Sequence, residues 1–384
     1  GAAVAALAFT EGYSRDYLGM HWTTDVLSGW LYGILLLALF ILASRVILGP
    51  ARPPAPSGAG TGTGTGAETV TGTGPAAARS WPLVSVIIPT RGRPGPVRAA
   101  ISAVMAQTYP GPIECLVVHD QEPPDDSLTA LATADRQIRI LANRRTPGLP
   151  GARNSGLAEA AGQLIASCDD DDVWHPAKLA AQVELLTRQP SLLVVGSGIR
   201  LVLPAGQAID WPARADRISH PMLLRNRVKE LHSSTLVAWR DAYAKAGWYD
   251  EQTPHGYAED YDWILRVARV GRIGAVRAPL ADIAKDRGSW WPGNAAVTAA
   301  GLEYLLARHP ELRKSARGHA RVLGQIAFSR SLLGQRGRAL RCAALALARW
   351  PASPHGYLAL AHIVTGVDRK HVLRAARLAG RGLA

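Results

Sequence analysis

Residues 84–90 read VSVIIPT, a short apolar stretch with the length of a strand. Beyond it, further short apolar runs alternate with amphipathic segments of helical spacing. The expected strands are 84–88, 113–118, 138–141 and 164–167, and the expected helices are 97–107 and 152–161. This alternation predicts an α/β domain with a largely parallel sheet, whose ligand site should lie at the carboxyl ends of the strands.

Residues 26–44 carry no charged side chain. At about 1.5 Å per residue, a helix of that length is about as long as the ~30 Å hydrocarbon core of a bilayer is thick. Trp22 and Trp30 stand near one end and Arg45 and Arg52 near the other, as in an aromatic belt and a positive-inside flank. The segment predicts a transmembrane helix, with a buried core helix as the alternative.

Composition also suggests where the other parts of the chain begin and end. Residues 51–80 are rich in Pro, Gly, Thr and Ala, which predicts a flexible linker. Past Gly301 the chain reads as helices at 302–308, 318–333 and 338–349, with a spacing similar to tetratricopeptide repeats. We expect a membrane segment over 1–48, the linker over 49–80, the α/β domain over 81–300 and a helical region over 301–384. Because the chain opens with Gly1 inside an apolar run, we also expect that its start is missing.

The chain has 43 Lys and Arg against 30 Asp and Glu, a net charge of +13. The basic residues are dispersed and no nucleic-acid module signature is present, so an anionic membrane surface or a phosphate-rich substrate is favoured over nucleic acid. The three cysteines are too few and too scattered for a disulfide framework or a zinc cluster, which indicates a reducing compartment.

Four consecutive carboxylates, Asp169 to Asp172, follow the strand expected at 164–167. Such carboxylates repel one another unless a cation lies among them, and oxygen ligands select Mg²⁺ or Mn²⁺, which can also hold a diphosphate. Pro176 suits the first turn of the next helix. The alternative is a solvated acidic turn or helix cap.

Five segments resemble those of glycosyltransferase family 2 and occur in the same order as in that family, whose domain has the fold called GT-A. The resemblance runs from about residue 81 to 287. The matching segments are VSVIIPT at 84–90 followed by Arg91 and Arg93, QTY at 107–109, VVHD at 117–120, GARNSG at 151–156 and CDDDDVW at 168–174.

The resemblance implies roles for individual residues. Asp120 would contact the base, Arg153 the base or ribose region, and Asp169 the ribose. Asp171 would bind the Mg²⁺ or Mn²⁺ that bridges the diphosphate, with Asp169 and Asp172 beside it. The full nucleotide-sugar-binding set is Pro89, Thr90, Arg93, Asp120, Arg153, Asn154 and Asp169. The base stays open, because His119 stands where the family usually has an acidic residue.

Two later segments, GWYDE at 247–251 and AEDYDW at 258–263, resemble the acceptor side of the same family. Inverting transfer requires a base that takes the proton of the acceptor hydroxyl. Asp260 is the predicted base, with Glu259 as its neighbour and alternative, while a charge cluster at a helix start would explain the pair without catalysis. Residues 232–234, HSS, lie where family members often meet the acceptor or the donor phosphates, unless they are a polar turn.

Residues 14–25, SRDYLGMHWTTD, resemble the last signature of the type 2 phosphatidic acid phosphatase superfamily. In that chemistry the His attacks phosphorus, the Asp orients the His imidazole, and the Arg neutralises phosphate oxygens. The matching residues are Ser14, Arg15, His21 and Asp25. The two earlier signatures are absent, so we expect a vestigial, inactive half. Its topology would place everything after residue 44 in the cytoplasm.

These observations predict an inverting glycosyltransferase at the cell membrane, with its catalytic domain in the cytoplasm. It would move a sugar from a nucleoside diphosphate sugar to a hydroxyl of an acceptor glycan or lipid-linked saccharide, for cell-envelope synthesis. One alternative is a lipid or polyprenyl phosphate phosphatase with an accessory soluble domain. Another is a non-catalytic scaffold that binds sugar nucleotides.

Overall fold

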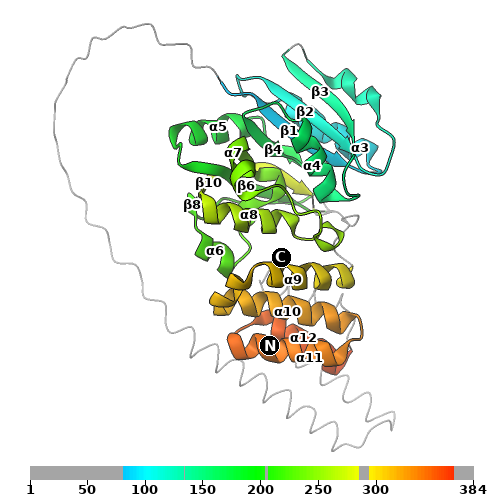
Figure 1. Ribbon diagram of the computed structural model, residues 1–384, viewed down its shortest axis with the longest axis vertical. Helices are drawn as coiled ribbons and strands as arrows, with labels where there is room; N and C mark the ends of the chain where they lie inside the picture. The colour runs from blue at the N-terminus through cyan, green and yellow to red at the C-terminus, as the bar shows by residue number, and fades with distance from the viewer. Residues whose placement is uncertain (1–80, 134, 204–205, 285–293, 367–384) are drawn as a thin grey trace, which may run out of the picture. The chain divides into compact units, whose positions relative to one another are not determined.

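A computed structural model describes residues 81–133, 135–203, 206–284 and 294–366 (Figure 1). The chain divides into two compact units, 1–75 and 76–384, and all described residues belong to the second. The expected membrane segment, its phosphatase-like residues and the linker lie outside the described residues. Within the described ranges, no helix has both the length and the apolarity that a membrane crossing requires.

One half of the central sheet is parallel. Strands β1 (Val84–Thr90), β2 (Ile113–His119), β3 (Arg136–Ala142) and β4 (Leu164–Ser167) lie in the order β3-β2-β1-β4. Every residue of β1, β2 and β4 is buried, as expected for strands covered on both faces. The helices α3 (Pro94–Met105) and α4 (Leu149–Glu159) pack with alternate residues of β1 and therefore cover opposite faces.

The other half of the sheet is mixed, so the expectation of a largely parallel sheet is wrong. Strand β9 (Val237–Trp239) lies between β4 and β6 (Leu192–Val202) and is antiparallel to both. Strand β10 (Arg272–Ala284) runs parallel to β6, and β5 (Val173–Trp174) antiparallel to β10. The reason is that β9 begins beside the carboxyl end of β4 and runs back along it. A parallel connection would require the chain to be carried to the other end of the strands first.

Helix starts also differ from the expected ones. Helices α3 and α4 begin three residues earlier than expected, each with a proline at one of the first two helical positions, which has no amide hydrogen to leave unsatisfied. Helix α5 (Lys178–Arg188) begins later, so Pro176 precedes the helix and does not lie in its first turn. The Pro176 carbonyl accepts a hydrogen bond from the amide of Thr108 (2.9 Å).

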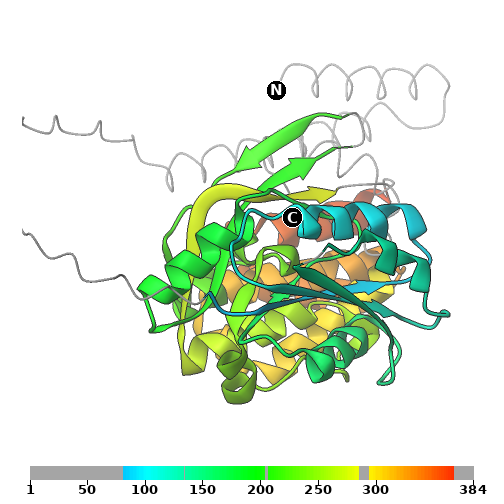
Figure 2. The ribbon, with the colours of Figure 1, turned by 90° about the horizontal axis from the view of Figure 1, so that it is seen from above.

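The remaining elements complete the sheet edge and the surrounding loops. Figure 2 shows β6 and β7 as a green hairpin beside β10. The elements not yet described are η1 (Asp126–Leu131), β7 (Ala208–Trp211), β8 (Arg217–Ile218), α6 (His220–Arg225), η2 (Lys229–Leu231), η3 (Ser233–Thr235), α7 (Arg240–Ala246), η4 (Pro254–Gly256), α8 (Glu259–Val270) and η5 (Pro310–Lys314).

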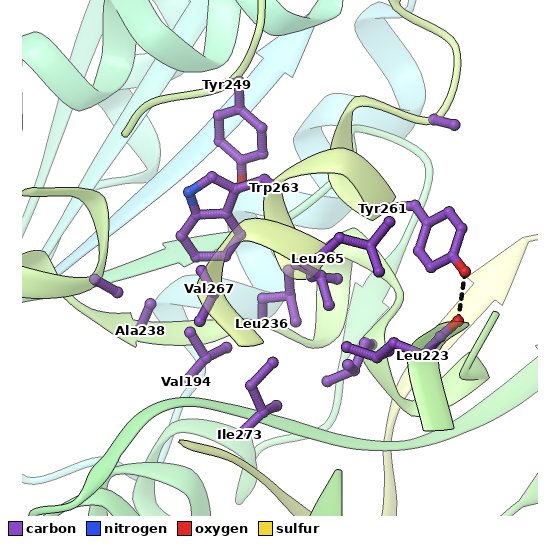
Figure 3. Close-up of a cluster of buried hydrophobic side chains, with 14 of the residues drawn as sticks. Val194, Leu223, Leu236, Ala238, Tyr249, Tyr261, Trp263, Leu265, Val267 and Ile273 are labelled. Atoms are coloured by element: carbon purple, nitrogen blue, oxygen red, sulfur yellow. Dashed lines mark hydrogen bonds between the residues drawn. The ribbon is translucent and has the colours of Figure 1, made fainter. Parts of the chain in front are cut away.

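Within residues 294–366, four α-helices follow the sheet: α9 (Ala295–Arg308), α10 (Ala316–Leu332), α11 (Arg336–Arg349) and α12 (Pro354–Thr365). The boundary expected after residue 300 falls inside α9. Buried residues of α9 and α10 belong to the same hydrophobic core as Trp263 of α8, part of which Figure 3 shows. Within the second unit, the C-terminal helices therefore share a core with the α/β part.

Candidate active site

The predicted site residues follow the carboxyl ends of neighbouring strands. Thr90 ends β1, Asp120 follows β2, and the acidic run follows β4. The amide of Asp120 donates to the carbonyl of Thr90 (2.9 Å), so the ends of β1 and β2 stay side by side beyond the strands. The topology brings these polar groups to one edge of the sheet, as expected for an α/β ligand site.

The acidic run divides into two pairs that face different partners. Asp170 and Asp171 face Arg93, whose Nη1 lies 3.0 Å and 2.7 Å from their carboxylate oxygens. Thr90 Oγ1 also donates to Asp170 (2.8 Å). Burial raises the pKa of Asp170 to about 6, despite these partners. Sequence reasoning gave Asp170 no role, although it contacts two residues of the predicted nucleotide site.

Asp169 and Asp172 face the segment at residues 232–234. Ser233 Oγ donates to Asp169 (2.7 Å), and Ser234 Oγ donates to Asp172. His232 Nδ1 lies 3.7 Å from Asp172. Residues 232–234 are therefore no simple polar turn, because all three side chains lie beside the acidic run.

A set of ligand atoms from Asp169, Asp172 and His232 lies within 4.8 Å of one another. Burial raises the pKa of Asp172 well above its ordinary range, and the charges of Asp169 and Asp171 raise it further. Two clustered carboxylates suit Mn²⁺ or Mg²⁺, whose charge would relieve their repulsion, and the imidazole nitrogen favours Mn²⁺ of the two. Asp171, the predicted metal ligand, lies outside this set and faces Arg93, whereas His232 was not predicted as a ligand.

Arg153 joins the acidic run to the start of α8. Its side chain is buried and bonds Asp169 through Nη2 (2.5 Å) and Glu259 through Nη1. Its Nε has no hydrogen-bond partner among the described residues. Arg153 thus connects the predicted donor side, at β4, to the predicted acceptor side, at α8.

The two acidic residues that open α8 have different partners and opposite pKa shifts. Burial raises the pKa of Glu259 to about 7, although Arg153 opposes the shift. Asp260 is also buried, but it accepts bonds of 2.9 Å and 2.6 Å from Arg227, and the charges of Arg227 and Arg153 hold its pKa below the ordinary range. Nothing local in the sequence marks Arg227, because its partner is 33 positions away.

Asp120 and Asn154 have partners within the protein. The Asp120 carboxylate accepts from Asn143 Nδ2 (2.7 Å) and from the amide of Gly148 (3.0 Å), whose φ of 116° favours glycine. Asn154 bonds both the amide and the carbonyl of Tyr249, and its Nδ2 donates to Glu251 (2.8 Å). Its amide group therefore holds the segment at 249–251. Pro89 is buried inside β1.

Comparison with known proteins fits this arrangement. The model of the family described as glycosyl transferase family 2 matches residues 85–206. Residues 85–206 are a glycosyl transferase family 2 domain. The model of the PAP2 superfamily matches residues 1–47, where the phosphatase-like signature lies. Both resemblances found in the sequence are thereby confirmed.

Relatives of the family 2 domain carry glycosyltransferase names. A UDP-Glc:alpha-D-GlcNAc-diphosphoundecaprenol beta-1,3-glucosyltransferase of Escherichia coli is 34% identical over 115 residues, which are 30% of this chain and 45% of the relative. An uncharacterized glycosyltransferase of Rickettsia prowazekii is 28% identical over 197 residues, which are 50% of this chain and 60% of the relative. The chain thus spans about half the length of these curated relatives.

A solved structure shares the fold of the family 2 domain. S. aureus TarS residues 1–349, in complex with UDP-GlcNAc, superposes with a TM-score of 0.52 at 16% identity, covering 78% of this chain and 93% of that one. The fold is therefore GT-A-like, with the mixed sheet described above.

Proposed function

We propose that this chain is an inverting glycosyltransferase that moves a sugar from a nucleoside diphosphate sugar to an acceptor hydroxyl. The observation that carries the proposal is the buried pair of contacts made by Arg153, with Asp169 on one side and Glu259 on the other. A transferase needs its donor and acceptor groups in one place, since holding the reactants together supplies much of the rate.

The donor would lie at the carboxyl ends of β1, β2 and β4. A divalent cation there, Mg²⁺ or Mn²⁺, would neutralise the diphosphate that leaves with the nucleotide. Asp169, Asp172 and His232 have the donor atoms to hold it, and Asp171 remains the ligand that the family resemblance implies. Thr90, Arg93 and Asp120 would border the nucleotide. The Escherichia coli relative is named for UDP-Glc, which favours uridine as the base.

The acceptor would meet the acidic pair at the start of α8. We keep Asp260 as the base and Glu259 as the alternative. The pKa of Glu259, about 7, supports the alternative, because a general base works best when its pKa is near the ambient pH. Asp260 would have to exchange at least one hydrogen bond from Arg227 for the acceptor hydroxyl.

We further propose a lipid-linked or cell-envelope acceptor and a site at the cytoplasmic face of the cell membrane. Three features support this: the apolar segment at 26–44, the PAP2 superfamily match at 1–47, and the lipid-linked acceptor in the name of the Escherichia coli relative. The vestigial phosphatase half would then serve as an anchor.

The test is release of nucleoside diphosphate by the purified full chain. UDP-glucose, UDP-GlcNAc and GDP-mannose are each supplied with Mn²⁺ or Mg²⁺, with and without a lipid-linked saccharide. Metal-dependent release that rises with acceptor supports the proposal. Hydrolysis of a polyprenyl phosphate without sugar transfer would favour the phosphatase, and nucleotide binding without turnover of any donor would favour the scaffold.

A further inference from the structure

The C-terminal helices contact two segments that precede Asp260 in the chain, α6 and the turn before α8, through glycines. A Cβ added to Gly318 of α10 would lie 1.7 Å from the carbonyl oxygen of Leu224, near the end of α6. A Cβ added to Gly301 of α9 would lie 2.7 Å from the ring of Tyr257, just before α8. At both places the helix approaches too closely for any side chain to fit between.

The segment that α9 contacts has an unfavourable backbone. His255 and Ala258 have φ values of 53° and 65°, in the left-handed region where the Cβ of a non-glycine residue is crowded. Ala258 immediately precedes Glu259 and Asp260. Such a conformation persists only where surrounding contacts determine it, and the contact of Tyr257 with Gly301 is one of them.

Arg321 of α10 fixes the residue that follows Asp260. Its Nη2 donates to Tyr261 Oη (3.2 Å), and its guanidinium carbon lies 5.8 Å from the centre of the Tyr261 ring. Tyr261 Oη in turn donates to the carbonyl of Leu223 in α6 (2.5 Å; Figure 3). Tyr261 is therefore held by α6 and α10 together.

Helix α12 packs against α10 about one helical turn beyond Arg321. His355 packs on Gly324 of α10, where an added Cβ would lie 2.7 Å from the His355 Cβ. Burial and the charge of Arg321 lower the pKa of His355 to about 4, so its imidazole is neutral at pH 7 and adds no repelling charge. The neutral His355 imidazole therefore does not repel the Arg321 guanidinium.

The same contacts position the partner of Asp260. Arg227, which bonds the Asp260 carboxylate, follows α6 by two residues, and α6 is held through Leu223 and Leu224. We propose that α9 and α10 are part of the acceptor side of the site, with Arg321 as a positioning residue that acts on Asp260 through Tyr261 and α6. This inference rests on the proposed function for its kinetic consequence.

The experiment compares Arg321→Met, Arg321→Lys and a control, Arg330→Met, in the full chain. Arg330 lies on the same helix and bonds Glu303 (2.5 Å) and Gln335, away from Tyr261. We expect Arg321→Met to lower kcat for transfer about tenfold or more, because small displacements of reacting groups are costly. The donor KM and metal-dependent UDP binding should stay within about twofold of wild type, and Arg321→Lys should recover most of the loss.

Hydrogen exchange of the backbone amides of residues 258–265 supplies a readout that needs no activity. Exchange should be faster in Arg321→Met than in Arg330→Met. Equal losses in both variants, or a matching loss of UDP binding, would mean that α10 only stabilises the fold and would overturn the inference. If wild type transfers no sugar, the proposed function fails, and unchanged exchange in Arg321→Met would then overturn the positioning role as well.

Discussion

Single residues divide the candidate site into a proposed metal side and a proposed base side. His232, Asp169 and Asp172 form one group, and Glu259 and Asp260 form the other, with Arg153 between them. The two groups would act on different steps, metal-dependent donor binding and acceptor deprotonation. Substitutions in them should therefore have separable effects.

His232→Ala should weaken Mn²⁺-dependent binding of UDP by about 10- to 100-fold, the usual effect of losing a group around a metal. Asp171→Ala should do the same if Asp171 turns from Arg93 toward the ion. The measurement is thermal shift with UDP, with and without Mn²⁺, and Asp210→Ala in the exposed pair with Arg200 is the control. Unchanged stabilisation in His232→Ala would remove His232 from the metal site.

Asp260→Asn should lower turnover by roughly 10²–10⁴-fold at unchanged donor affinity, because it removes the basic oxygen and keeps the shape. Glu259→Gln is the matched variant and should lose much less. Steady-state kinetics at saturating acceptor decide between them. Near-normal turnover in Asp260→Asn together with a large loss in Glu259→Gln would assign the base to Glu259.

The residue types at the site could be predicted from the sequence, but not their pairing. Asp169, Arg153 and Glu259 were each predicted from their own segments, and the structure brings them into contact. Nothing in the sequence indicated that Asp171 faces Arg93 or that Arg227 faces Asp260. Such pairs join positions far apart in the chain, and residue type alone does not select one partner among many cations.

Among the structural elements, α5 begins with a buried cation. Lys178, the first residue of the helix, is fully buried, with Nζ 3.8 Å from the centre of the Trp174 ring and no hydrogen-bond partner among the described residues. Burial lowers its pKa to about 7 from an ordinary value of 10.5. The cation–π contact with Trp174 compensates only part of the lost hydration.

The contribution of Lys178 to the stability of the domain should therefore rise with pH between about 7 and 10. In this range the unfolded chain holds a proton on Lys178 that the folded chain has released, so the contribution of Lys178 to the free energy of unfolding increases with pH. Denaturant unfolding of wild type and Lys178→Met at pH 7 and pH 9 should show a difference in pH dependence on the order of a few kcal/mol. Lys245→Met, in an exposed pair with Asp241, should behave as wild type. Equal pH slopes in wild type and Lys178→Met would contradict the expectation.

The strands of the parallel half of the sheet could be predicted from the sequence, whereas those of the mixed half, including the long β6 and β10, were not. Strands β1, β2 and β4 lie within two residues of their expected ends, because fully buried strands read as continuous apolar runs. Strand β9 has three residues, and β5 and β8 have two each, too few for a recognisable period. Because these short antiparallel strands were not recognised, the sheet was predicted to be largely parallel.

At the scale of the whole molecule, the division between residues 75 and 76 separates the described unit from what precedes it. We expect a truncated chain that begins at Trp81 to fold and to bind UDP with Mn²⁺ as the full chain does, because the linker composition can form no packed core. Circular dichroism and UDP thermal shift of the truncated chain are the measurements. Loss of folding on truncation would refute the role of residues 1–80 as a tether.

The position of β9 sets an order of events during synthesis. Strand β4 (Leu164–Ser167) is an open edge until Val237–Trp239 leave the ribosome and pair with it. An apolar edge strand with unpaired backbone groups is a template for association between chains. Fragments that end before Val237 should therefore aggregate, and a nascent chain should need chaperone protection until β9 closes the sheet.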